Sequence, residues 1–158
     1  MAAKLVNESK SEEIYSLYLR GRDEGDELYY RCKQTYGFYK THFVDFRELI
    51  FKQNLVVFND GNNQLIVENL SKTNAVNSTL IVRHMAGSKV FMREALELLE
   101  RLFAKRNIGK VKLLCFAKEL EKDADSLAEI GFVKELGYQV GNAERVHYAY
   151  EFRGVNTL

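Results

Sequence analysis

The most regular pattern in the chain is an apolar stripe in its second half. Its positions recur every three or four residues and are Phe91, Ala95, Leu98, Leu99, Leu102 and Phe103. This spacing places side chains on one face of an α-helix. Ser88 precedes the stripe as a candidate N-cap, and Gly109 lies past its end. We therefore predict an amphipathic helix that begins near Ser88.

Short runs rich in β-branched residues lie on both sides of this helix. Residues 54–58 and 64–70 flank an Asn-Asp-Gly turn signal and predict a β-hairpin, which a polar loop over 71–78 follows. The other expected strands are 79–82, 110–117, one that begins at Phe132, and 146–152. A shorter helix is expected over 119–130, where Gly131 ends it.

The first third of the chain has helical periodicity. Residues 9–33 predict a helix, which the two glycines within 20–25 are expected to interrupt. A second helix is expected over 39–52, and residues 4–7 predict a short edge strand.

Together these elements predict one α/β (α+β) domain over residues 1–158. Residues 1–52 form its mainly helical part, and residues 54–152 supply the sheet and the crossover helices. A meander followed by a strand, a helix and a strand predicts a mixed β-sheet with helices on its faces.

Composition narrows the classes of function. The 23 basic and 22 acidic residues nearly cancel, which argues against an electrostatic nucleic-acid binder. Cys32, Cys115 and three scattered histidines match neither a disulfide framework nor a zinc spacing, so we expect no metal. The N-terminus lacks the apolar core of a signal peptide, and no run reaches membrane-spanning length. We therefore expect a cytoplasmic protein that inserts into no membrane, with the nucleus left open as a second location.

The order of elements is similar to that of the acyl-CoA-dependent N-acetyltransferases. A strand that ends at Val82, a turn and a helix from Ser88 resemble the part of that fold that cradles pyrophosphate on backbone N–H groups. Ile130-Gly131-Phe132 resembles the Gly-Phe that ends the last helix of the fold. The resemblance implies an N-acetyltransferase-like topology and, as one alternative, an acetyl-CoA-dependent enzyme.

The residues that carry the chemistry of that family are replaced in this chain. The family's loop has Arg or Gln, two residues, Gly, one residue and Gly, whereas Arg83–Ser88 has Ala86 and Ser88 at the glycine positions. Leu127 stands where the family has a tyrosine general acid. The substitutes that the sequence offers are Tyr148, Cys115 and His147, each of which also fits an ordinary strand. An N-acetyltransferase with a degenerate CoA loop is therefore the second interpretation.

Five short motifs support a different first interpretation. They are Gly87-Ser88-Lys89 before a helix with Leu96, Glu97 and Glu100; Leu114-Cys115-Phe116-Ala117-Lys118; Asp123 or Asp125; Gly131-Phe132; and Tyr148-Ala149-Tyr150-Glu151-Phe152. In this order and with nearly constant spacing, they resemble the ornithine decarboxylase antizyme family. The resemblance covers residues 79–152, with an insertion near 106–109.

The resemblance to antizymes implies a binding protein, not an enzyme, that uses no cofactor. An antizyme is made by polyamine-induced ribosomal frameshifting and binds the ornithine decarboxylase monomer. It blocks homodimerisation of the enzyme and promotes its ubiquitin-independent degradation by the proteasome, which restrains polyamine synthesis and uptake. Antizyme inhibitor competes for the same surface. We expect the free chain to be a monomer.

The partner-binding residues that the resemblance implies are Lys89, Glu97 and Glu100, and Glu94 extends them into an acidic ridge. Glu97 and Glu100 are three residues apart, so they share one helix face. Glu97 also forms an i,i+4 pair with Arg93, which makes a solvated helix face the alternative. Given the family resemblance, the acidic ridge is the preferred interpretation.

Overall fold

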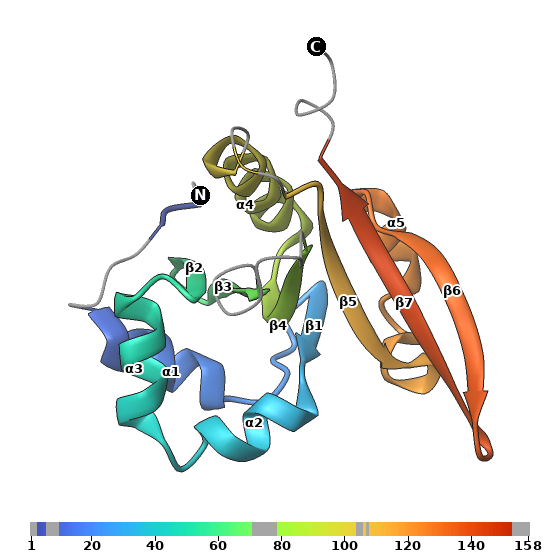
Figure 1. Cartoon of the computed structure of the whole chain (residues 1–158), viewed down its shortest axis with the longest axis horizontal. Coiled ribbons are helices and arrows are strands. Elements are labelled where there is room, and N and C mark those ends of the chain that lie inside the picture. The colour runs from blue at the N-terminus through green and yellow to red at the C-terminus, as the bar shows by residue number, and fades with distance from the viewer. Residues whose placement is uncertain (1–2, 6–9, 71–78, 104–105, 107, 153–158) are drawn as a thin grey trace.

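The computed structural model describes residues 3–5, 10–70, 79–103, 106 and 108–152. In chain order its elements are α1 (Ser11–Leu19), β1 (Leu28–Arg31), α2 (Lys33–Tyr39), α3 (Phe43–Phe51), β2 (Leu55–Asp60), β3 (Asn63–Asn69), β4 (Thr79–Gly87), α4 (Lys89–Leu102), β5 (Lys110–Phe116), a 3₁₀ helix (Ala117–Leu120), α5 (Ala124–Ile130), β6 (Val133–Val140) and β7 (Ala143–Glu151) (Figure 1). None of the described helices is long and apolar enough to span a membrane.

The strands form one mixed sheet in the order β2-β3-β4-β5-β7-β6, and β1 pairs with β4 off this path. The pairing of β4 with β5 is parallel, while the other pairings are antiparallel. Helix α4 connects the two parallel strands, as a crossover connection must. The predicted α/β class and mixed sheet are therefore confirmed.

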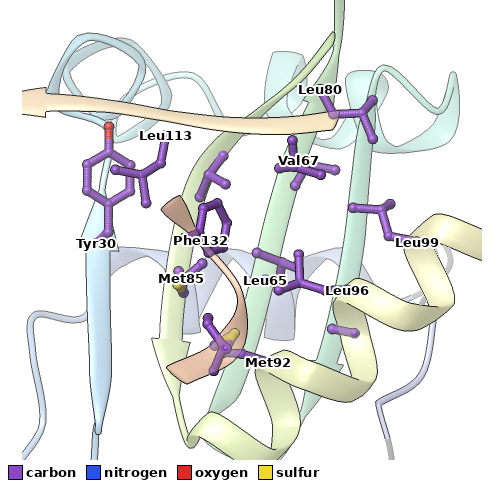
Figure 2. Packing of buried hydrophobic residues seen from close by; sticks show 14 of the residues in the cluster. Tyr30, Leu65, Val67, Leu80, Met85, Met92, Leu96, Leu99, Leu113 and Phe132 are labelled. Atoms are coloured by element: carbon purple, nitrogen blue, oxygen red, sulfur yellow. The ribbon is translucent and has the colours of Figure 1, made fainter. Parts of the chain in front are cut away.

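Helices cover the two faces of the sheet with separate cores. On one face, α4 and α5 pack on a large cluster that includes Leu65, Met85, Leu96, Leu113 and Phe132 (Figure 2). On the other face, α1, α2 and α3 pack on a smaller aromatic cluster around Tyr18 and Phe46. Each fully buried apolar side chain of this kind contributes about 1.5–3 kcal/mol relative to exposure, so both cores hold the sheet in place.

Local sequence signals explain several element boundaries. The Ser88 hydroxyl accepts a hydrogen bond of 3.1 Å from the Phe91 amide and caps α4, as predicted. The β2–β3 hairpin closes with Asp60 opposite Asn63, around Gly61 in a left-handed conformation. Gly131, with φ of 108°, ends α5.

The N-terminal part differs from the helices that its periodicity predicts. Helix α1 ends at Leu19, and within the predicted helix over 9–33 the segment Leu28–Arg31 is a strand. Its side chains alternate between buried and half-buried, and its backbone bonds are satisfied by β4, which extends five residues beyond Val82. A tertiary partner thus overrides the local preference.

Two further expectations for the N-terminal part are modified. The helix predicted over 39–52 is divided between α2 and α3, with a break around His42. Leu5 makes a single bridge to Phe58 where an edge strand over 4–7 was expected. The rest of that strand, like the loop over 71–78, lies outside the described residues.

Candidate functional site

Strands β4 and β5 diverge in the middle of the sheet. They pair in parallel only at Thr79–Ile81 with Lys110–Lys112. Beyond this point the edge of β4 pairs with β1, from Arg31 opposite His84 to Leu28 opposite Gly87. The sheet therefore opens between two parallel strands at their carboxyl ends, beside β1 (Figure 1).

Tyr30 connects the diverging strands. Its ring is buried, and its hydroxyl donates a hydrogen bond of 2.7 Å to the carbonyl oxygen of Leu114 on β5 (Figure 2). Burial raises the pKa of this phenol far above its ordinary value, so the group stays protonated. Tyr30 thus fixes the width of the opening.

A cavity of about 320 Å³ lies at this opening. It is bounded by β1 and the start of α2, by β4, by β5 and the following 3₁₀ helix, and by the β6–β7 hairpin. Besides Tyr30, the polar side chains of its wall are Cys32, Lys33, Gln34, Arg83, Cys115, Glu119, Tyr138, Arg145 and His147. The Tyr138 and His147 rings contact each other edge to face at 5.6 Å between centroids. This volume is in the range of small-molecule sites.

The two cysteines of the cavity wall differ in acidity. Burial alone would raise the pKa of Cys32, but hydrogen bonds from Thr35 and the Arg83 guanidinium, 3.5 Å from the sulfur, outweigh it and lower that pKa. Burial raises the pKa of Cys115 to about 12. Arg83 also pairs with Glu68 at 2.9 Å, so it is held between a carboxylate and a thiol. Cys32 is therefore the more acidic thiol of the site.

The N-terminus of α4, which begins directly after β4, already binds protein acceptors. The Ser88 amide donates to Asn63 Oδ1 at 2.9 Å, and the Lys89 amide donates to Glu27 Oε1 at 3.1 Å. The Lys89 ammonium lies 3.8 Å from Glu27 Oε2 and 2.6 Å from Glu129 Oε2. These carboxylates raise the pKa of Lys89, with Glu129 as the main cause. An anionic oxygen thus occupies the start of the helix.

Backbone packing explains why this junction has no open glycine loop. Gly87 has φ of 133°, and a Cβ at this position would lie 2.1 Å from Asn63 Oδ1. Gly87 is therefore needed for the contact with the β3 side chain, rather than for the approach of a ligand.

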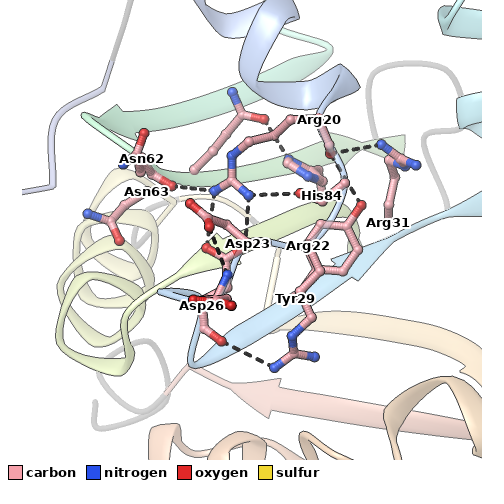
Figure 3. A network of polar contacts seen from close by, with 12 residues as sticks. Arg20, Arg22, Asp23, Asp26, Tyr29, Arg31, Asn62, Asn63 and His84 are labelled. Atoms are coloured by element: carbon pink, nitrogen blue, oxygen red, sulfur yellow. Dashed lines mark hydrogen bonds and ion pairs between the residues drawn. The ribbon is translucent and has the colours of Figure 1, made fainter.

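Two bidentate ion pairs fix the loop that carries Glu27. Arg20 binds Asp26 at 2.8 and 3.1 Å (Figure 3), and Arg22 binds Asp123 at 2.8 and 2.9 Å. Burial would raise the pKa of Asp26, but Arg20 and the Asp23 amide outweigh it and keep that pKa low. Asp123 is buried before α5, so the second pair ties the loop to that helix. The first pair thus closes the loop on itself beside the end of α1, and the second pair ties the loop to α5.

A buried histidine lies beside this loop. His84 Nδ1 is 2.6 Å from Gln64 Oε1, and burial lowers the pKa of His84 to about 3, with Arg31 and Arg20 adding to the shift. The imidazole is therefore neutral and helps to pack β4 against Tyr18, whose ring is 5.2 Å away.

The residues predicted to bind a partner do not join this cavity. Lys89 begins α4 and pairs with Glu27 and Glu129, while Glu94 accepts a hydrogen bond of 2.9 Å from the Ala3 amide. Glu97 is exposed and Glu100 is half-buried further along α4. Their role in binding depended on the antizyme resemblance.

The structure separates the three catalytic substitutes considered from sequence. Cys115 and His147 line the cavity, whereas Tyr148 packs against the large core. Sequence reasoning did not find Tyr30 or Cys32 as site residues. The alternation of Leu28, Tyr30 and Cys32 was the available signal, because all three are buried along one strand and its end.

Solved structures with a similar fold are acetyltransferases. No protein-family model matches the sequence, and a search for sequence relatives among curated proteins finds none. A probable acetyltransferase from Staphylococcus epidermidis ATCC 12228 aligns with a TM-score of 0.65 and 11% identity, over 96% of this chain and 98% of that chain. The ribosomal L7/L12 alpha-N-protein acetyltransferase RimL, solved with coenzyme A, aligns with a TM-score of 0.61 and 13% identity, over 98% of this chain and 94% of that chain. The spermidine/spermine N-acetyltransferase SpeG from Vibrio cholerae aligns with a TM-score of 0.54 and 13% identity, over 95% of this chain and 93% of that chain.

These alignments correct the first interpretation of the sequence. They extend over the N-terminal part, where the antizyme resemblance had no motif, and the proteins that they match are acetyltransferases. The antizyme interpretation is therefore wrong, together with the non-enzymatic, decarboxylase-inhibiting role that it implied. The acetyltransferase alternative agrees better with these matches. The chain has the N-acetyltransferase fold.

Proposed function

We propose that the chain is an acyl-CoA-dependent N-acetyltransferase that transfers an acetyl group to an amine. The observation that carries this proposal is the divergence of β4 and β5 beside a cavity of about 320 Å³. An opening at the carboxyl ends of parallel strands is a common place for ligands in α/β sheets. Here it would let a donor and an acceptor meet within the sheet.

The contacts at the start of α4 suit an anionic group of a donor. It binds a carboxylate oxygen of Glu27 through the Lys89 amide, with the Lys89 ammonium near the second oxygen. Backbone N–H groups at a helix start favour anions in this way. The pyrophosphate of an acyl-CoA would be held by the same Lys89 groups after Glu27 turns outward. When bound, acetyl-CoA supplies a thioester whose carbonyl carbon an amine can attack.

Residues of the cavity wall have the chemistry that an acceptor amine needs. An amine attacks only in its neutral form, so a base must take its proton. Glu119 and His147 are the carboxylate and the imidazole among the described wall residues, and we assign them as alternative proton acceptors. Tyr30 keeps the opening at a fixed width through its bond to β5.

Binding of the donor is the first test. We expect coenzyme A and acetyl-CoA to raise the melting temperature of the purified chain, because a ligand that binds only the folded state must stabilise it. Lys89→Glu is expected to abolish this shift, whereas Lys52→Glu, which makes the same charge change at the end of α3, is expected to keep it. If millimolar acetyl-CoA leaves the melting temperature of the wild-type chain unchanged, the proposal fails.

A further inference from the structure

The charged side chains around the cavity are mostly basic. Lys33, Arg83 and Arg145 line it, opposed by the carboxylate of Glu119. A second hollow adjoins it, shares Tyr30, Lys33 and Glu119 with it, and adds Arg31. Counted over the described residues that line the two hollows, cations outnumber carboxylates.

Ion pairs compensate only part of this positive charge. Arg83 is paired with Glu68 at 2.9 Å, and Lys33 lies 3.9 Å from Glu119 with 77% of its side chain exposed. Arg31 donates instead to carbonyl oxygens at 3.1 to 3.2 Å, two of them in the last turn of α1 and the third on Arg20, the next residue. Carbonyl oxygens bear no net charge. Even with Glu68 included, the lining therefore has four cationic side chains against two carboxylates and is net basic.

The Arg31 guanidinium is held ready to bind an anion. Its carbon lies 3.5 Å from the centroid of the Tyr36 ring and 6.0 Å from that of Tyr29. Stacking and three carbonyl contacts fix the planar group in one orientation, which lowers the entropy lost when it binds a ligand. Tyr29 and Tyr36 line the same hollow, so the anion would meet an aromatic wall.

We propose that the acceptor of this protein is a small amine that itself carries an anionic group, a carboxylate or a phosphate. The inference rests on the proposed acetyl transfer and names its substrate class. The cavity volume of about 320 Å³ suits a free small molecule, and its basic wall repels polycations. The acceptor class therefore differs from that of SpeG, which acts on spermidine and spermine, because like charges disfavour the wrong partner.

Matched amines test the charge preference directly. We compare 4-aminobutyrate with 4-aminobutyramide, and glucosamine 6-phosphate with glucosamine. Each pair keeps the amine, and only its first member carries an anionic group. Spermidine serves as the cationic amine. Acetyl transfer is followed by release of coenzyme A, and acceptor binding is followed separately by thermal shift in the presence of coenzyme A. We expect the anionic member of each pair to bind and react more strongly, by about two- to fivefold for each partly exposed charge contact. Equal or weaker binding of the anionic members overturns the inference.

Charge variants locate the effect. Lys33→Glu should remove or reverse the preference, and because Lys33 is 77% exposed the variant is expected to fold. Arg31→Lys keeps the charge but loses the planar stack, so it should weaken the anionic amines alone. Lys52→Glu is the control for overall charge, since Lys52 lines neither hollow. If Lys33→Glu keeps the preference for anionic amines, the inference is overturned. If the wild type binds no acetyl-CoA at all, the proposed function fails instead.

Discussion

In the proposed function, Glu27 occupies the place that the anionic group of the donor would take, so its charge should weaken donor binding. Glu27→Gln removes the charge but keeps the shape, and the amide oxygen can still accept from the Lys89 amide. In the wild type, the carboxylate must leave both the Lys89 amide and the neighbourhood of the ammonium before the donor binds. We predict that coenzyme A binds more tightly to Glu27→Gln than to the wild type.

The size of the effect follows from the exposure of the contact. The Glu27 side chain is 48% exposed, so its interaction is of the surface kind. A carboxylate at an exposed helix N-terminus contributes about 0.3–1 kcal/mol. Removal of this competing interaction should lower the dissociation constant of coenzyme A by about two- to fivefold, since 1.4 kcal/mol corresponds to a factor of ten.

Isothermal titration of coenzyme A into the wild type and the variant measures this difference. Glu24→Gln is the matched control, because Glu24 lies in the same exposed loop but binds no group of α4. Raising the ionic strength should reduce the difference, as screening weakens exposed charges. Equal affinity of Glu27→Gln and the wild type, or weaker binding to Glu27→Gln, would refute the competition between Glu27 and the donor.

Three further predictions concern single buried groups. Tyr30→Phe removes the buried hydrogen bond to β5 and should lower the free energy of unfolding by about 1–3 kcal/mol. Tyr29→Phe loses only a 3.5 Å contact and should change that free energy less. Equal losses of the two variants in urea unfolding would contradict the argument. Cys32 should be alkylated at a lower pH than Cys115, because the pKa of Cys32 is lowered and that of Cys115 is raised; mass spectrometry of the modified peptides against pH shows the order, and the reverse order is the contrary outcome. The pKa of His84 is lowered to about 3 in the folded state, so the unfolded state binds the proton first as the pH falls. The free energy of unfolding should therefore decrease as pH decreases from about 6.5, by at most about 1.4 kcal/mol per pH unit. His84→Gln should remove this slope from the pH dependence of unfolding, and an identical slope would exclude His84 as its source.

Local patterns predicted the elements whose partners are near in sequence. The β2–β3 hairpin and α4 follow from a turn signal, a helical stripe and the Ser88 cap. Strand β1 was missed because four residues are too few to show a period, and its partner β4 lies more than fifty residues away. The cavity was missed for the same reason, since its wall combines β1, β4, β5 and β7.

The antizyme resemblance failed for a different physical reason. Several of its motif residues are packing positions, since Cys115 and Phe132 are buried in the large core, and Gly131 is the left-handed end of α5. Residues of this kind indicate a strand or the end of a helix, and they do so in proteins of different function. The order of the motifs in residues 79–152 therefore indicated the fold. It did not indicate binding to ornithine decarboxylase.

The loop with Glu27 lies between the proposed donor site at the start of α4 and the strand that carries residues of the proposed acceptor site. Arg20–Asp26 and Arg22–Asp123 fix its backbone, and the next residues form β1, which carries Tyr30 and Arg31 to the two hollows. Because two bidentate pairs hold the backbone of the loop, we expect a donor to displace Glu27 by rotation of its side chain alone. A donor at α4 would therefore leave the position of β1 unchanged. It follows that donor and acceptor should bind with little coupling between them, unless their own groups touch within the opening.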